Sequence, residues 1–97
     1  MATYIVLGSF TDQGIRSVKD TLQRMEGCRE MAKKSGVIMK ESLWALGAFD
    51  LIWIFEAPDD QSMTALGLSM GALGNVRTQT LRAFSAADMS TILGHVT

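Results

Sequence analysis

The stretch Leu51-Ile-Trp-Ile-Phe-Glu56 decides the fold, together with Thr3-Tyr-Ile-Val-Leu-Gly-Ser-Phe10 near the start of the chain. Both stretches are rich in β-branched and aromatic residues, which predicts strands. A strand with one solvent-exposed face typically alternates apolar and polar residues, and neither stretch shows this alternation. Trp53 points to one face, while Ile52 and Ile54 point to the other. Both strands are therefore predicted to lie in the middle of a sheet.

The rest of the chain predicts two more strands and three helices around this pair. Three- and four-residue apolar spacing indicates the longer helices, and capping residues indicate where helices begin or end. The expected elements, in chain order, are a helix from Ile15 that ends before Gly36, a strand Val37–Leu46, a short hairpin loop Gly47–Asp50, a helix that begins at Asp59 or Asp60 and ends near Gly74, a strand Val76–Phe84, and a C-terminal helix after Ser85.

The order strand, helix, strand, strand, helix, strand predicts an α+β sandwich. In the ferredoxin-like βαββαβ arrangement, the first and third strands of the four-stranded antiparallel sheet are central and the second and fourth lie at its edges. Lys40, Glu41, Arg77 and Arg82 fall on the two expected edge strands, where charge blocks unwanted pairing. We expect a single domain over residues 1–97, because neither a linker nor a repeat interrupts the pattern.

The composition excludes several functional classes. The chain has 97 residues, is 47% hydrophobic and 20% charged, and carries a formal charge of -1 without a Lys/Arg cluster, so nucleic acid is not an expected partner. One cysteine and one histidine provide neither a disulfide nor a structural zinc site, and we expect no metal and no cofactor. No stretch approaches the ~20 apolar residues of a membrane span. These features predict a cytoplasmic protein with no membrane association.

The two apolar faces of the central strands imply a partner. Two helices shield one face of a sheet, and the other face then needs a further layer. A second copy of the same sheet, packed ~10 Å away, is the simplest source. We therefore predict a homo-oligomer, at least a dimer. The alternative is that the short C-terminal helix folds back across the open face.

Three motifs carry a resemblance to the GYD-domain family of small bacterial proteins. They are Thr3-Tyr-Ile-Val-Leu-Gly-x-Phe-Thr-Asp-Gln-Gly-Ile-Arg16, Gly47-Ala-Phe-Asp50 with the later Glu56-Ala-Pro-Asp-Asp60, and Gly74-Asn-Val-Arg-Thr-x-Thr-Leu-Arg-Ala-Phe84. The resemblance implies the paired ferredoxin-like subunits of a dimeric α/β barrel, and a biochemical role that is not established. Phe49 replaces the tyrosine usual in the namesake motif, whereas Asp50 is retained.

Four residues are candidates for a ligand site: Tyr4, Asp50, Trp53 and Arg82. Asp50 is the candidate catalytic base, or else a turn residue that bonds nearby backbone. Arg82 can bind a carboxylate or phosphate, or else pair with Glu41 or Glu56. The fourth strand is expected to place Arg82 with two threonines on one face and Arg77 on the other.

Other residues have ordinary structural interpretations. Thr11 or Asp12 is expected to cap a helix. Gly67 and Gly71 are expected to allow close packing of another backbone, and Met25, Met63, Met70 and Met89 are expected to fill the core. Cys28 is expected to be a lone thiol, at the surface or half-buried, rather than a nucleophile.

The leading hypothesis is a homo-oligomer that binds a small molecule, in a cavity between sheet and helices or at the subunit interface. The first alternative is a cofactor-independent enzyme, such as a small monooxygenase or isomerase, that acts on an acidic or aromatic metabolite. The second is an architectural assembly subunit without a ligand. The sequence leaves open whether the protein is an enzyme.

Overall fold

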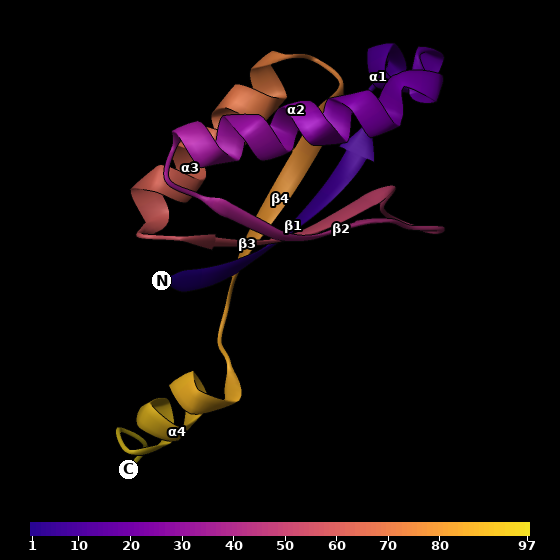
Figure 1. The fold of residues 1–97 in the computed structure, drawn as a ribbon. Coiled ribbons are helices and arrows are strands. Elements are labelled where there is room, and N and C mark those ends of the chain that lie inside the picture. Colours follow the sequence, from indigo (N-terminus) through magenta and orange to yellow (C-terminus); the bar gives the residue numbers. More distant parts are fainter.

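A four-stranded antiparallel sheet with helices on one face forms the body of the molecule (Figure 1). The computed structural model describes all residues from 1 to 97. Its elements are β1 (Ala2–Phe10), α1 (Asp12–Arg16), the 3-10 helix η1 (Val18–Asp20), α2 (Thr21–Lys34), β2 (Ile38–Trp44), β3 (Leu51–Ala57), α3 (Asp60–Ala72), β4 (Val76–Ala83) and α4 (Ala86–Leu93). The predicted ferredoxin-like α+β fold is confirmed.

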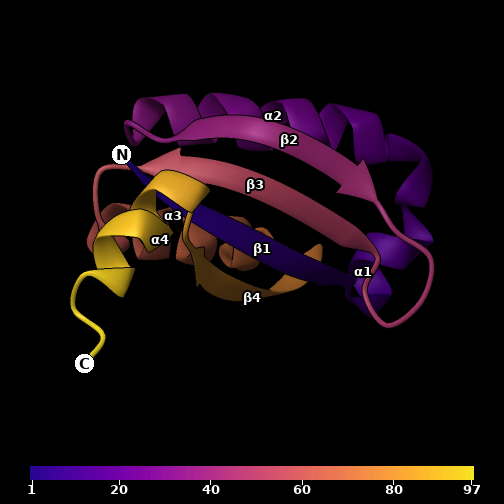
Figure 2. The same cartoon turned by 90° about the horizontal axis from the view of Figure 1, so that it is seen from below.

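The strand order is β2-β3-β1-β4, so the two apolar strands are central, as predicted. Figure 2 looks onto the sheet from the side opposite α2 and α3 and shows this order. In the register, Val6 pairs with Trp53 and with Thr80, and all three side chains point toward the helices. Arg77 and Arg82 lie on opposite faces of β4, as predicted, and the register places Arg82 beside Tyr4 on the helix side.

The first helical segment differs from the prediction, because it is divided into α1, η1 and α2. Thr11 caps α1 as expected, and its side chain accepts the Gly14 N–H. Its hydroxyl also donates to the Gly74 carbonyl at 2.5 Å, and its backbone N–H donates to the Asn75 carbonyl at 3.1 Å. These long-range bonds hold α1 against the start of β4. The helical segment is therefore interrupted after α1 and continues as η1 and α2.

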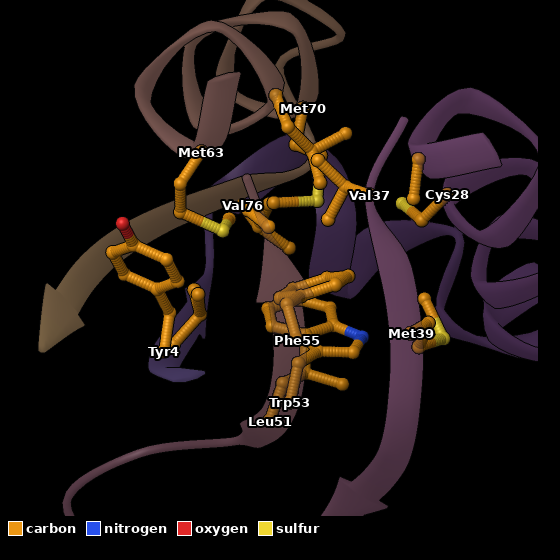
Figure 3. Close-up of a cluster of buried hydrophobic side chains, with 14 residues drawn as sticks. Tyr4, Cys28, Val37, Met39, Leu51, Trp53, Phe55, Met63, Met70 and Val76 are labelled. Atoms are coloured by element: carbon orange, nitrogen blue, oxygen red, sulfur yellow. The ribbon is translucent and has the colours of Figure 1, made fainter. Parts of the chain in front are cut away.

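The core fills the space between the sheet and the helices (Figure 3). Phe55 and Leu66 are fully buried, and Met63 and Met70 are 1% exposed, so the predicted core roles of these two methionines are confirmed. Truncation of a large buried ring such as that of Phe55 typically lowers the free energy of unfolding by about 3–5 kcal/mol. The helix-facing side of the sheet therefore supplies most of the chain's own stability.

The other face of the sheet is apolar and uncovered. Ile5, Leu7, Ile52 and Ile54 lie on it, each only half-buried by its neighbours. We call these four residues, with Leu81 of β4, the open face. Predicted apolar side chains on both faces of the central strands are thus confirmed.

The C-terminal helix does not cover the open face. After β4 the chain leaves the sheet, and α4 lies apart from the body on the open-face side (Figure 1). No residue of α4 is buried. Its start is correctly predicted, because Ser85 and Asp88 form a reciprocal capping box. The alternative that α4 folds back across the sheet is wrong, and so is the core role expected for Met89, which is 40% exposed.

Two helical glycines lack the close contacts expected of them. A Cβ added at Gly67 or Gly71 would meet no atom within 4 Å, so the predicted close packing is wrong for the folded chain. Gly14 is the opposite case, because a Cβ there would lie 2.0 Å from the Asn75 carbonyl oxygen. The glycine that the fold requires is in α1, not in α3.

We predict opposite effects for alanine at these positions. Gly71→Ala should stabilise the fold by about 0.5–1 kcal/mol, because alanine is the better helix former and has free space. Gly14→Ala should destabilise it by about 1–3 kcal/mol, because the methyl group displaces backbone. Urea denaturation of both variants measures this, and a destabilised Gly71→Ala would show that a backbone does pack there.

Candidate functional site

A cavity of about 160 Å³ lies between α2 and the helix-facing side of the sheet. Ten of its fifteen lining residues are hydrophobic, so its walls are mainly apolar. The lining residues are Phe10, Thr21, Arg24, Met25, Gly27, Cys28, Met31, Ser42, Trp44, Leu51, Trp53, Met70, Leu73, Asn75 and Val76. A cavity of about 150 Å³ is large enough for a benzene-sized molecule.

Two residues that line the cavity each carry a buried polar atom without a hydrogen-bond partner. These atoms are the indole Nε1 of Trp53 and the hydroxyl Oγ of Ser42. Trp53 is only 3% exposed, and the two residues are directly opposite each other in the β2–β3 register. The Trp53 indole nitrogen lies on the β2 side of its ring (Figure 3). Unpaired buried polar atoms are rare and costly, so each of these two atoms can bond to a water molecule or to a ligand.

The polar residues at the rim of this cavity are already bonded. Trp44 donates from Nε1 to the Thr21 hydroxyl at 3.0 Å. Arg24 donates to the Gly14 carbonyl at 3.1 Å and lies over the Phe10 ring, with Cζ 5.9 Å from its centre. No carboxylate lines the cavity. Among the lining residues, Trp53 and Ser42 are the two whose buried polar atoms have no bond at all.

Cys28 adds a thiol to the cavity wall. It is buried, and burial raises the pKa of the thiol because the charged thiolate loses hydration. A raised pKa keeps the thiol protonated near neutral pH, and a protonated thiol is a poor nucleophile. Cys28 is a lone thiol, as predicted, but it is buried in the core rather than half-buried or at the surface, because α2 turns it toward the sheet.

A second cluster joins Tyr4 to Asp60 at the other end of β1. The Tyr4 hydroxyl donates to the Asp60 carboxylate at 2.5 Å. The Arg82 guanidinium lies over the Tyr4 ring at 5.5 Å and over the Phe84 ring at 4.6 Å. The same guanidinium donates to the backbone carbonyls of Thr3 and Ala83. No ion pair links Arg82 to Glu41 or Glu56 within the chain.

Asp50 forms bonds that hold the end of the sheet. Its carboxylate accepts the Phe10 N–H at 2.9 Å, and its own N–H donates to the Gly8 carbonyl at 2.8 Å. Its carbonyl also accepts the Ala45 N–H at 2.8 Å. This geometry fits the turn interpretation of Asp50, and it gives the carboxylate a backbone partner instead of a substrate proton.

The four predicted site residues thus lie in three places. Trp53 lines the cavity, Tyr4 and Arg82 adjoin each other at shallow surface hollows, and Asp50 holds the β3 turn. Sequence reasoning missed Ser42 and Asp60. The polar side chain of Ser42 within β2 could have marked it as a candidate. The face of the sheet that Ser42 occupies, however, depends on a register shift between Met39 and Glu41.

Two further structural features bear on function. No group of three or more His, Cys, Asp or Glu side chains is placed to hold a metal ion. None of the helices has the length and hydrophobicity required to cross a lipid bilayer.

We predict that Tyr4 ionises above its ordinary value of about 10. Its pKa is raised, first by the hydrogen bond it donates to Asp60 and then by burial. Tyr4 is the single tyrosine of the chain, so absorbance at alkaline pH reports it alone. Asp60→Ala should move the midpoint down toward 10, and Asp59→Ala, which removes a carboxylate that instead caps α3, should move it less. Equal shifts in the two variants would contradict the assignment.

The same shift predicts how stability depends on pH. The unfolded chain releases the tyrosine proton at a lower pH than the folded chain does. The contribution of the raised pKa to folding is therefore fully present below about pH 10 and is lost as pH rises through the folded pKa. Tyr4→Phe should remove this alkaline loss in urea titrations at several pH values. An alkaline loss of the same size in the variant would assign it to another group.

Comparison with known proteins places the chain in a family. The GYD domain model matches residues 4–93. A curated protein from Thermus thermophilus, named glutamine synthetase and cystathionine beta-lyase binding protein, is 31% identical over 90 residues, which are 92% of this chain and 95% of that protein.

Two crystal structures share the fold. FFRP-DM1 has a TM-score of 0.58 at 20% identity and covers 87% of this chain and 100% of its own. TTHA0845 from Thermus thermophilus has a TM-score of 0.58 at 23% identity and covers 89% of this chain and 96% of its own. From the family match over nearly its whole length, the chain belongs to the GYD domain family.

Proposed function

We propose that this protein is a homo-oligomer that binds a small molecule in the cavity between α2 and the sheet. The observation that carries the ligand-binding part is the pair of unpartnered polar atoms, Trp53 Nε1 and Ser42 Oγ, in residues that line a largely apolar cavity. An apolar cavity with a few convergent polar groups is typical of a ligand site. A purely architectural subunit would gain stability by filling this space.

The amount of exposed surface supports the homo-oligomer. The chain exposes 6335 Å², whereas a compact monomer of 10.6 kDa exposes about 5,500 Å². The excess of about 850 Å² is close to the ~800 Å² that each partner buries in a standard interface. The radius of gyration of 14.5 Å also exceeds the roughly 12.5 Å of a compact chain of this length.

A second copy fits this surface better than an unrelated partner does. The open face and α4 lie on the same side of the molecule (Figure 1), so two copies stacked on their open faces bring each α4 alongside the other copy. One two-fold arrangement then covers the open face of each copy and also α4, whose Met89 and Leu93 are exposed. The paired sheets of this assembly are those of a dimeric α/β barrel.

Binding of another protein is a second candidate function. It is favoured by the name of the Thermus relative, which describes binding to glutamine synthetase and cystathionine beta-lyase. Enzymatic function has less support, because the Asp50 carboxylate accepts a backbone N–H. The protein-binding and ligand-binding roles are compatible, since the cavity and the open face lie on opposite sides of the sheet.

We predict that light scattering at micromolar concentration gives at least twice the subunit mass of 10.6 kDa. Ile54→Arg should lower the mass, because it puts a charge in the middle of the open face. Leu68→Arg makes the same kind of change at an exposed helix position and should leave the mass unchanged. A wild-type mass of 10.6 kDa would overturn the homo-oligomer.

We also predict that aromatic fragments bind in the cavity and protect Cys28. The chain has one cysteine, and it lines the cavity, so a bound fragment should slow its reaction with a disulfide reagent such as dithiobis(nitrobenzoate). The control is Cys28→Ser with Ser90→Cys, which moves the thiol to α4. A fragment panel that leaves the Cys28 rate unchanged throughout would overturn ligand binding in this cavity.

A further inference from the structure

We propose that the cavity ligand is a neutral ring compound with one oxygen that accepts a hydrogen bond from Trp53, such as a phenol or an aryl ketone. This proposal rests on the ligand-binding function proposed above and names the chemical class that the site selects. Three features of the cavity lead to it: its size, its charge, and the bonding capacity of its two unpartnered atoms.

The size restricts the ligand to a single ring with few substituents. The cavity measures about 160 Å³, and a benzene ring fits a cavity of about 150 Å³. Aromatic rings form part of its wall, from Phe10 on β1 and Trp53 on β3. A flat ring therefore finds aromatic neighbours, which favour stacked or edge-to-face contact.

The charges around the cavity disfavour a cationic ligand, and the uncharged side chains of Trp53 and Ser42 call for a neutral bonding group. Arg24 is the only charged side chain that lines it, and the guanidinium already donates to the Gly14 carbonyl and to the Ser17 hydroxyl. No carboxylate is available to pair with a cationic ligand. A neutral molecule enters without the desolvation cost of an unpaired charge.

The two unpartnered atoms define the polar group of the ligand. An indole N–H is only a donor, so Trp53 can be satisfied only by an acceptor. The Ser42 hydroxyl both donates and accepts. These residues are paired across β2 and β3, and we infer that a single ligand oxygen bonds to both. A carbonyl oxygen can accept from both side chains, and a phenol hydroxyl can accept from Trp53 and donate to Ser42.

Trp44 provides a matched comparison within the same cavity. It also lines the cavity, but its indole N–H already donates to Thr21 at 3.0 Å. Loss of the indole N–H of Trp53 should therefore change the ligand selectivity of the cavity, whereas loss of the indole N–H of Trp44 should not. The chain has no other tryptophan.

The test compares two ligands of nearly equal shape, 4-fluorophenol and 4-fluorotoluene. The first has a hydroxyl group where the second has a methyl group. Fluorine NMR titration measures the Kd of each ligand. In the wild-type protein we define the selectivity as the Kd of 4-fluorotoluene divided by that of 4-fluorophenol. Trp53→Phe should reduce this selectivity about tenfold, the size expected when a buried donor loses its partner. Trp44→Phe should leave it unchanged.

A measurement on the wild-type chain keeps the proposal testable if Trp53→Phe does not fold. Each tryptophan gives one indole N–H signal in a proton–nitrogen correlation spectrum, and Trp44→Phe assigns the two. The Trp53 signal should move downfield with 4-fluorophenol and much less with 4-fluorotoluene.

The outcomes separate this proposal from the one it rests on. If both ligands bind and Trp53→Phe leaves the selectivity unchanged, or the Trp53 signal responds equally to both, the proposed ligand class is wrong and ligand binding stands. If neither ligand binds but other fragments protect Cys28, the class is again wrong. If no fragment of the panel protects Cys28, both proposals fail.

Discussion

The sheet of this protein has two apolar faces and helices for only one of them. Ile52 and Ile54 alternate with Leu51, Trp53 and Phe55 along one central strand, so burial of either set leaves the other on the open side. The core between sheet and helices forms within one chain. Cover for the open face requires material from outside it, because α4 lies apart from the sheet. The large exposed area of the chain reflects the open face and the separate α4, and its elongated shape reflects the position of α4.

The candidate cavity depends on an irregularity in an edge strand. The β2–β3 register shifts between Met39 and Glu41, which places Met39 and Ser42 on the helix side. Without the shift, simple alternation would put Glu41 on the same face of the sheet as Met39, and Ser42 would point to the open face. The register shift therefore places Ser42 directly opposite Trp53 in the sheet. It creates a polar site inside a wall that is otherwise built for packing.

Sequence reasoning succeeded where one local pattern decides the structure. Continuous apolar runs identified the central strands, and Ser85 with Asp88 identified the start of α4. It failed where the outcome depends on contacts between distant segments. The break before α2 follows from bonds between Thr11 and the Gly74–Asn75 turn. The close packing expected at Gly71 does not occur, since helix spacing shows which residues share a face but not what lies opposite.

The sequence by itself determined the order of the strands and the longer helices, the strand order in the sheet and the apolar character of both faces of its central strands, because these follow from the spacing of apolar residues along each element. Only the tertiary structure decided which candidate residues meet. It separated Trp53 from Tyr4 and Arg82, gave the Asp50 carboxylate to the backbone of Phe10, and joined Tyr4 to Asp60 across 56 residues. Side-chain partners depend on strand register and helix position, and these are fixed only when the whole core packs together.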